Sequence, residues 1–283
     1  MSSQALVEQE LSIERVRAAV LWPREHGAWG LLSAPLLLGT IVARRAAGSD
    51  WMSWSAFVVA AVALFLLRTP LEARIGHGVV RVANERERRA TDARVAWFGT
   101  VALVATGLVL SLLPIVPVLL AGIVAAAAYG ASWSTGISKR SAQLLAALAM
   151  AAGAPLACIA LAGTGIRRTT LLCALAGAAF ITADQVSFVH LKVATLQNGT
   201  RVARWRTGWL FLLFQSFTVV ALALAVQRGL LTPVALLGFA PMLVRGFWHF
   251  LRNGNRVSFR RLGFTELAYT AIAVGGLGMG IAV

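Results

Sequence analysis

Long apolar runs alternate with short polar or basic segments along the chain, from Gly27 to Val283. A helix needs about twenty residues to cross the roughly 30 Å of hydrocarbon in a bilayer, and each run is close to that length. The pattern therefore predicts an all-α, polytopic membrane bundle with about nine transmembrane helices. The predicted spans are residues 27–43, 51–67, 95–113, 115–133, 142–162, 169–189, 209–226, 230–248 and 263–283.

Two prolines decide the count of spans. Pro114 and Pro117 stand where the third run meets the fourth. Proline lacks an N–H donor and disfavours a helical conformation at the residue before it, so a turn is favoured over one unbroken helix. Residues 1–22 are charged and have no long apolar run, which predicts a cytoplasmic segment rather than a cleaved signal peptide. Residues 23–283 are predicted to form one polytopic membrane domain.

Composition agrees with this pattern. The chain is 58% apolar and 13% charged, with a mean hydropathy of +0.76, whereas soluble proteins contain roughly 25% charged residues. These values exclude a chain built from soluble domains. The net charge of +15 would suggest a nucleic-acid partner in a soluble protein. Beside membrane spans it favours membrane lipids and anionic ligands instead, with no nucleic acid.

The basic residues are distributed unequally between the two sides of the predicted bundle. Because Lys and Arg concentrate in cytoplasmic loops, the side that holds most of them is predicted to be cytoplasmic. The N-terminus then lies in the cytoplasm and the C-terminus outside. Only five of the 26 Lys and Arg residues fall on the outer side: Arg44, Arg45, Arg167, Arg168 and Arg228.

Several ionisable residues map to the cytoplasmic half of the spans. Glu25, Asp184 and Glu266 are acids at this level, and all four histidines share it. Ionisable groups within a span are costly and tend to face an internal cavity, so a polar cavity open to the cytoplasm is predicted. His26 and Trp29 stand three residues apart on one helix face. Glu25, His26 and Asp184 are the candidate acid–base groups, because a histidine titrates near neutral pH.

Basic residues surround the same mouth. A stripe formed by Arg245, His249, Arg252 and Arg256 is predicted to continue the eighth span beyond the membrane. Guanidinium groups bind phosphate oxygens well, which suggests an isoprenoid or lipid phosphate as ligand. An ordinary inner-leaflet surface would also be basic, so that alternative stays open. The predicted ligand-binding residues are Trp29, Arg81, Arg88, Lys192, His249, Arg252 and Glu266.

Two short segments carry a family resemblance. The chain opens its first span with PREHGAW at residues 23–29 and its last with RRLGFTE at residues 260–266. Both resemble the corresponding segments of the YwiC-like family of bacterial membrane proteins. The resemblance implies a multi-span protein of the bacterial cytoplasmic (inner) membrane.

The architecture also resembles the UbiA-type intramembrane prenyltransferases, in its nine helices and its two long cytoplasmic loops, 68–94 and 190–208. That resemblance implies Asp-rich motifs that hold Mg²⁺ and a prenyl diphosphate. This chain departs from the pattern, with NERE at residues 84–87 and Asp92 in the first loop, and only Asp184 before a basic second loop. Mg²⁺ is therefore expected only if the chain is such a transferase. No two histidines have the helical spacing of metal ligands, so no metal site is predicted, while haem ligands that converge from different helices stay an open alternative.

Three classes of function remain open. The chain could be a prenyltransferase-like enzyme, or a non-catalytic accessory factor whose basic surface docks onto a respiratory or other membrane complex. A transporter ranks last, because the outer face offers few polar groups. Cys158 and Cys173, in neighbouring spans, are small packing residues or a bridged pair. Four glycines of the last span, Gly275, Gly276, Gly278 and Gly280, are predicted to permit close helix packing.

Overall fold

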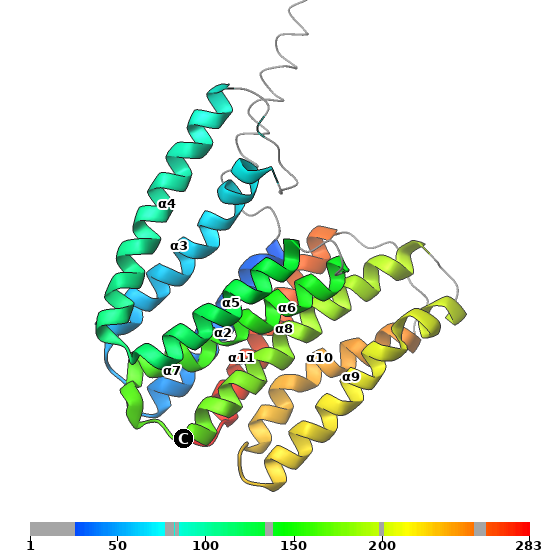
Figure 1. The fold of residues 1–283 in the computed structure, drawn as a ribbon. Helices are drawn as coiled ribbons and strands as arrows, with labels where there is room; N and C mark the ends of the chain where they lie inside the picture. The colour runs from blue at the N-terminus through cyan, green and yellow to red at the C-terminus, as the bar shows by residue number, and fades with distance from the viewer. Residues whose placement is uncertain (1–25, 77–81, 83–84, 134–137, 198–200, 252–258) are drawn as a thin grey trace, which may run out of the picture. The chain divides into compact units, whose positions relative to one another are not determined.

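The structure is a computed structural model, and it describes residues 26–76, 82, 85–133, 138–197, 201–251 and 259–283. Apart from one short bridge between Leu231 and Ile281, the regular structure in these ranges is helical (Figure 1). The predicted N-terminal segment, 1–22, lies outside them. The elements are α2 (His26–Arg45), α3 (Trp51–Ile75), α4 (Glu85–Leu112), α5 (Ile115–Trp133), α6 (Lys139–Ala151), α7 (Gly153–Ala162), η1 (Gly163–Gly165), α8 (Arg168–Gln197), α9 (Arg201–Gln227), α10 (Pro233–Leu251) and α11 (Phe259–Gly280).

The all-α prediction is confirmed: eight of the nine predicted spans fall largely on one helix each, and the fifth falls on two. Large apolar side chains face outward, as Leu103, Phe217 and Leu237 do with 75%, 60% and 72% exposure, which suits contact with lipid. The chain is therefore a polytopic membrane protein. Seven stretches of the described chain are long and apolar enough to cross a membrane: Trp51–Ile75, Glu85–Leu112, Arg140–Gly165, Arg168–Thr195, Trp205–Gln227, Pro233–Leu251 and Arg261–Gly280.

Two breaks in the helices have a local cause. Pro114 separates α4 from α5, as predicted. The fifth predicted span is divided at Ala152 into α6 and α7. Pro155 explains this second break, because its nitrogen cannot donate to the carbonyl of Ala151 and its ring crowds that turn.

Where the structure describes them, the two predicted cytoplasmic loops, 68–94 and 190–208, are largely helical. α3 continues to Ile75 and α8 to Gln197, well beyond the apolar runs that they contain. Ion pairs between residues four apart support the polar parts of α3 and α4: Arg68 with Glu72 at 2.7 Å in α3, and Glu85 with Arg89 at 3.8 Å in α4. Bilayer thickness therefore sets the length of an apolar run but not the end of its helix.

The helices form two compact units. The first comprises Trp29, α4 and most of α3. Arg74 and Asp92 join α3 to α4 through a 2.5 Å ion pair, and Trp29 packs edge-on against Phe65 at 5.1 Å between ring centroids.

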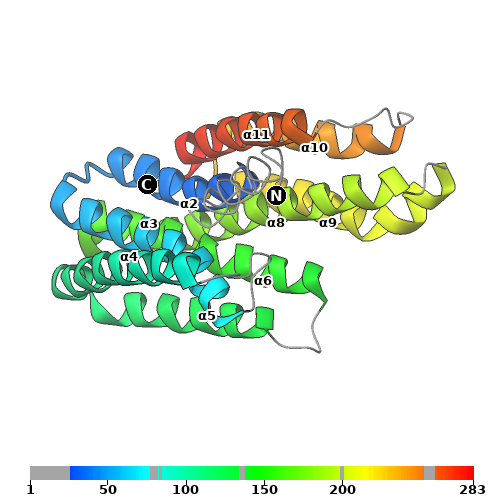
Figure 2. The ribbon, with the colours of Figure 1, turned by 90° about the horizontal axis from the view of Figure 1, so that it is seen from above.

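The second unit comprises residues 30–54 and 113–283. In both views α11 lies beside α10 and α8 beside α9 (Figures 1 and 2), and α8 also contacts α11. An apolar core runs between them, built from residues such as Ile181, Phe239 and Leu277. Asp50 begins α3 in this unit: its Oδ1 accepts from the Ser53 amide at 3.0 Å and its Oδ2 from the Ser53 hydroxyl at 2.6 Å. These hydrogen bonds hold the pKa of Asp50 below its ordinary value.

Glycines bring α10 and α11 into backbone contact. A Cβ added to Gly276 would lie 2.4 Å from the Cα of Gly238, and one added to Gly238 would lie 2.6 Å from the Cα of Gly276. A Cβ at Gly278 would meet Ile41 of α2, at 2.7 Å. The packing role predicted for these glycines is thus confirmed, except at Gly275, which has no atom within 4 Å of such a Cβ.

Cys158 of α7 and Gly39 of α2 lie at the contact between these two helices. Both cysteines are free thiols, and the Cys158 thiol donates to the carbonyl of Gly39 at 3.2 Å. A Cβ on Gly39 would stand 2.2 Å from the Ala154 carbonyl oxygen. Cys158 is therefore a packing residue of this contact.

Replacing Gly276 with Ala should destabilise the protein, because the new methyl group meets backbone that cannot move aside alone. We expect a loss of about 1–3 kcal/mol in the free energy of unfolding, measured by thermal or denaturant unfolding in detergent micelles. Gly275→Ala, one residue earlier, is the matched control and should be neutral or slightly stabilising. Equal losses in the two variants would contradict the close approach.

Candidate functional site

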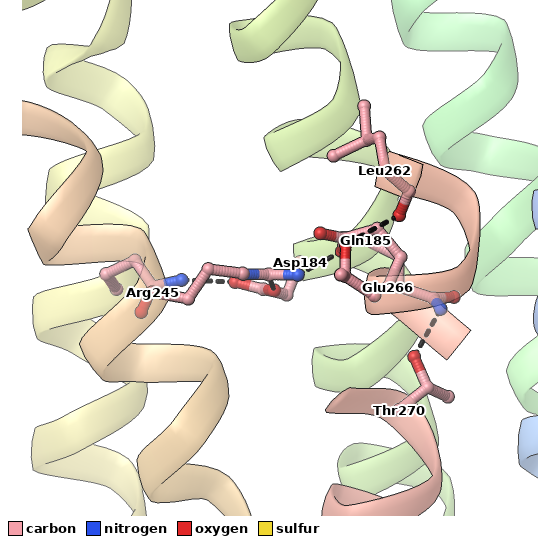
Figure 3. Close-up of polar contacts among 8 residues, drawn as sticks. Asp184, Gln185, Arg245, Leu262, Glu266 and Thr270 are labelled. Carbon is pink, nitrogen blue, oxygen red and sulfur yellow. Dashed lines mark hydrogen bonds and ion pairs between the residues drawn. The ribbon is translucent and has the colours of Figure 1, made fainter. Parts of the chain in front are cut away.

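A buried ion cluster joins α8, α10 and α11 (Figure 3). The guanidinium of Arg245 reaches from α10 to two carboxylates, donating through Nη2 to Asp184 Oδ2 and through Nη1 to Glu266 Oε2. The three side chains are almost fully enclosed, with exposures of 7%, 6% and 5% for Arg245, Asp184 and Glu266. We call these three residues the charged centre.

Amides and hydroxyls surround the charged centre. Gln215 of α9 donates to Asp184 Oδ1, and Gln185 of α8 donates to the Thr270 hydroxyl of α11. Gly246 makes room for the first of these contacts, because a Cβ there would lie 2.8 Å from Gln215 Nε2. All four helices of this part of the bundle therefore contribute a polar group to one place.

Aromatic rings enclose the cation. The Cζ atom of Arg245 lies 4.0 Å from the centroid of Phe188 and 5.2 Å from that of Tyr269, so cation–π contacts from α8 and α11 add to the ion pairs. The Nζ atom of Lys192 stands 5.8 Å from the same Phe188 centroid. Lys192 also interacts electrostatically with Glu266, more weakly than Arg245 does.

The charged centre lies inside the membrane-spanning part of the helices. Glu266 follows the start of α11 by seven residues, and Arg245 precedes the end of α10 by six, which places both about 10 Å from those helix ends at 1.5 Å per residue. Ionisable groups at such a depth are rare, and they usually mark a functional site.

His249 stands one turn beyond Arg245 on α10, nearer the helix end. It is buried at 7% exposure, and its Nε2 lies 3.5 Å from the Thr195 hydroxyl of α8. Its ring meets those of Phe188 and Phe250 edge-on, with centroids 5.8 Å and 5.5 Å apart. This group therefore continues the polar line from the charged centre toward the end of α8.

The structure brings some of the predicted site residues together. Asp184 and Glu266 share the charged centre, and Lys192 and His249 lie beside it. Arg88 is exposed on α4 in the first unit, and Trp29 packs on Phe65 in the same unit. The predictions for Glu25, Arg81, Arg252 and the side chain of His26 fall outside the described residues.

One prediction about these residues is wrong. Arg245 and His249 were expected on a basic stripe that leaves the membrane, but both are buried between helices. The physical reason is that α10 ends at Leu251, and α11 already begins at Phe259, four residues before its predicted span. The two side chains therefore lie deeper than the apolar runs suggest.

Sequence reasoning missed Arg245, Gln185, Gln215 and Thr270 as members of the site. A signal was available, because Gln185 and Gln215 are polar residues inside apolar spans, where such groups usually face a partner. Arg245 gave a misleading signal, since an arginine near a span end is ordinarily a topology marker.

The acidic residues described do not fit the Mg²⁺ site that a UbiA-type enzyme implies. Asp184 and Glu266 already bind Arg245. In the first predicted loop Glu85 pairs with Arg89, and Asp92 pairs with Arg74. Among the described residues no cluster of three His, Cys, Asp or Glu side chains forms.

A surface hollow of about 330 Å³ lies elsewhere, at the end of the bundle where α8 begins. Arg45, Arg167 and Thr170 line it, and Arg45 Nη1 donates to the Gly278 and Ile281 carbonyls at the end of α11, at 3.1 and 2.5 Å. The charged centre itself is closed, since Asp184 and Glu266 are each only 4% exposed when the whole residue, backbone included, is counted. The cytoplasmic cavity therefore stays a prediction.

The comparison with known families bears on the first half of the chain. Residues 22–162 match the family model described as YwiC-like protein. Over these residues the chain belongs to the YwiC-like family. No curated protein and no solved structure matches the chain. In this YwiC-like protein the matched residues comprise α2 to α7, whereas the charged centre is built by α8, α10 and α11, which follow them.

Replacing Arg245 with Met should destabilise the YwiC-like protein strongly, because two buried carboxylates lose their shared partner. We expect a loss of about 3–5 kcal/mol in the free energy of unfolding, measured by denaturant unfolding in micelles. Adding Asp184→Asn and Glu266→Gln should recover most of that loss, since no buried charge then remains. The exposed Arg228→Met is the control. A small effect of Arg245→Met, or no recovery in the triple variant, would contradict the ion cluster.

Proposed function

We propose that this YwiC-like membrane protein binds and releases a proton at the charged centre, and that its activity is linked to this proton. One observation carries the proposal: two buried carboxylates share a single guanidinium. A protein that needed only a structural ion pair would be satisfied by one carboxylate for one arginine.

The charge balance supports a bound proton. With both carboxyl groups ionised, Asp184, Arg245 and Glu266 carry a net charge of −1 away from water. An uncompensated charge in such a place costs several kcal/mol, and a carboxyl group can avoid this cost by taking up a proton. Lys192 reduces the imbalance from a distance, but it is half-buried and acts on Glu266 more weakly than Arg245 does.

The hydrogen-bond balance points the same way. Three buried acceptor atoms in or beside the charged centre have no donor among the described residues: Gln185 Oε1, Gln215 Oε1 and Glu266 Oε1. Of the buried donors in the same place, Arg245 Nε has no acceptor among the described residues. A carboxyl group gains an O–H donor when it is protonated. One proton bound by the pair of carboxylates therefore cancels the net charge of −1, and it also adds a hydrogen-bond donor where acceptors are in excess.

Infrared difference spectroscopy tests this proposal, since the C=O band of a carboxylic acid disappears when its proton leaves. Wild-type protein in bilayers should lose about one such band per molecule between neutral and alkaline pH, a range in which exposed carboxyls stay ionised. Asp184→Asn alone, or Glu266→Gln alone, should abolish the signal, because Arg245 then neutralises the single carboxylate that remains.

Asp92→Asn is the control, because Asp92 is half-exposed on α4 and pairs with Arg74 outside the charged centre. It should leave the infrared signal unchanged. No signal in the wild type, or a signal that survives in both single variants of the charged centre, would contradict the proposal.

A second candidate is the predicted binding of an isoprenoid or lipid phosphate, as a UbiA-like transferase or another lipid-handling protein would do. It is favoured by two basic residues. Lys192 lies beside the charged centre, and Arg140, at the start of α6, interacts electrostatically with His190 in the last two turns of α8. The acid–base pair of the charged centre would then serve the bound lipid. The alternative of a non-catalytic accessory factor uses the same basic residues for docking onto a membrane complex.

Lipid mass spectrometry of gently purified protein distinguishes these candidates. A phosphate ligand should co-purify with the wild type and fall about tenfold in Lys192→Met, which corresponds to the roughly 1.4 kcal/mol expected of one charged contact. Arg168→Met, an exposed change at the opposite end of α8, should retain it. Equal lipid content in the two variants would count against the phosphate site, and a stoichiometric protein partner would favour the accessory factor.

We also propose that the protein lies in the bacterial cytoplasmic membrane with its N-terminus inside. The distribution of Lys and Arg supports this orientation, with five of 26 on the side where α2 ends and α8 begins. The charged centre then lies nearer the cytoplasm.

A further inference from the structure

We propose that His249 carries the proton between the charged centre and the end of the bundle at which α8 ends, so that the centre exchanges protons with one side of the membrane. This inference rests on the proposed function, because a relay requires a site that holds the proton. It concerns the rate and the sidedness of exchange, whereas the proposed function concerns only the bound proton.

The position of His249 suits a relay. It follows Arg245 by four residues on α10 and therefore lies on the same helix face, one turn nearer the helix end. Its Nε2 is 3.5 Å from the Thr195 hydroxyl, and Thr195 lies in the last turn of α8. Imidazole can accept a proton on one nitrogen while it releases another from the second nitrogen, near neutral pH.

Charged groups from three helices lie around the Phe188 ring, which contacts His249. Arg245 Cζ of α10 lies 4.0 Å and Lys192 Nζ of α8 lies 5.8 Å from the Phe188 centroid, and Arg245 binds Glu266 of α11. α9 places the Phe211 ring against Phe188, with centroids 5.9 Å apart.

The opposite direction lacks such a route in the described residues. Between the charged centre and the start of α8 lies the apolar core, with Ala178 and Ile181 on α8, Phe239 and Met242 on α10, and Leu277 on α11. A proton would therefore have to cross several turns of hydrocarbon to leave that way.

The transfer step changes no other bond. Neutral His249 accepts a proton from water at the end of the bundle, and the imidazolium then releases the proton of its other nitrogen to a carboxylate of the charged centre. Phe188 contacts both His249 and the guanidinium of the charged centre, with its centroid 5.8 Å from that of His249 and 4.0 Å from Arg245 Cζ. On the proposed route, a turn of this ring admits a water molecule that carries the proton from the imidazolium to the carboxylate.

A pH jump followed by time-resolved infrared detection tests the relay in proteoliposomes. His249→Gln should keep the carboxylic-acid band and its equilibrium pH dependence nearly unchanged, yet slow proton exchange about a hundredfold, the scale that one placed acid–base group contributes. A merely structural histidine would change the equilibrium or the stability rather than the rate. His190→Gln is the matched control, because His190, at the same end of the bundle, contacts Gln143 at 2.5 Å instead.

Sidedness gives a second measurement that needs no substitution. In vesicles with the protein in one orientation, the band of wild-type protein should follow the pH of the compartment that faces the end of α8. A band that follows either compartment equally, or a His249→Gln variant that exchanges at the wild-type rate, would overturn the relay while leaving the proposed function intact. If the wild type lacks the band, the proposed function itself fails.

Discussion

The contact of Arg245 with Asp184 and Glu266 is the interaction on which the second unit depends. It joins three helices inside the membrane-spanning part of the chain, where none of the three charged groups is exposed to water. Such a cluster is not retained for stability alone, because apolar side chains of similar size often stabilise a bundle as well or better. Its excess of one carboxylate instead makes the centre responsive to protons. The surrounding amides, rings and glycines hold this arrangement in place.

Much of the fold could be predicted from the chain. Apolar runs near twenty residues long predicted a helix in every place where the structure has a span, because the bilayer restricts the length of such runs. Pro114 marked a break correctly, whereas the effect of Pro155 on α6 and α7 was overlooked. Helix ends could not be predicted from apolarity, since ion pairs such as Arg68 with Glu72 extend α3 into water.

The site was predicted only in part, for a related reason. Asp184 and Glu266 stood out because acids within spans need partners, and the structure places them together. Their partner Arg245 was assigned to the surface, because the predicted end of its span was three residues too early and the start of the next was four residues too late. An arginine near the membrane surface indicates on which side of the membrane its loop lies, whereas an arginine deeper in the span forms a buried ion pair. The sequence alone gives this depth only to within about one helical turn. The contacts of Gln215 and Gly246 depend on how α9 meets α10, which no local pattern contains.

Solid-state carbon-13 NMR of the side-chain carboxyl groups tests the central claim most directly, because the chemical shift of a carboxyl carbon reports its protonation residue by residue. At neutral pH the spectrum should show one proton shared between Asp184 and Glu266 in each molecule, with Arg245 still bound to both. Two fully ionised carboxylates at that pH, balanced by Lys192 alone, would contradict the account.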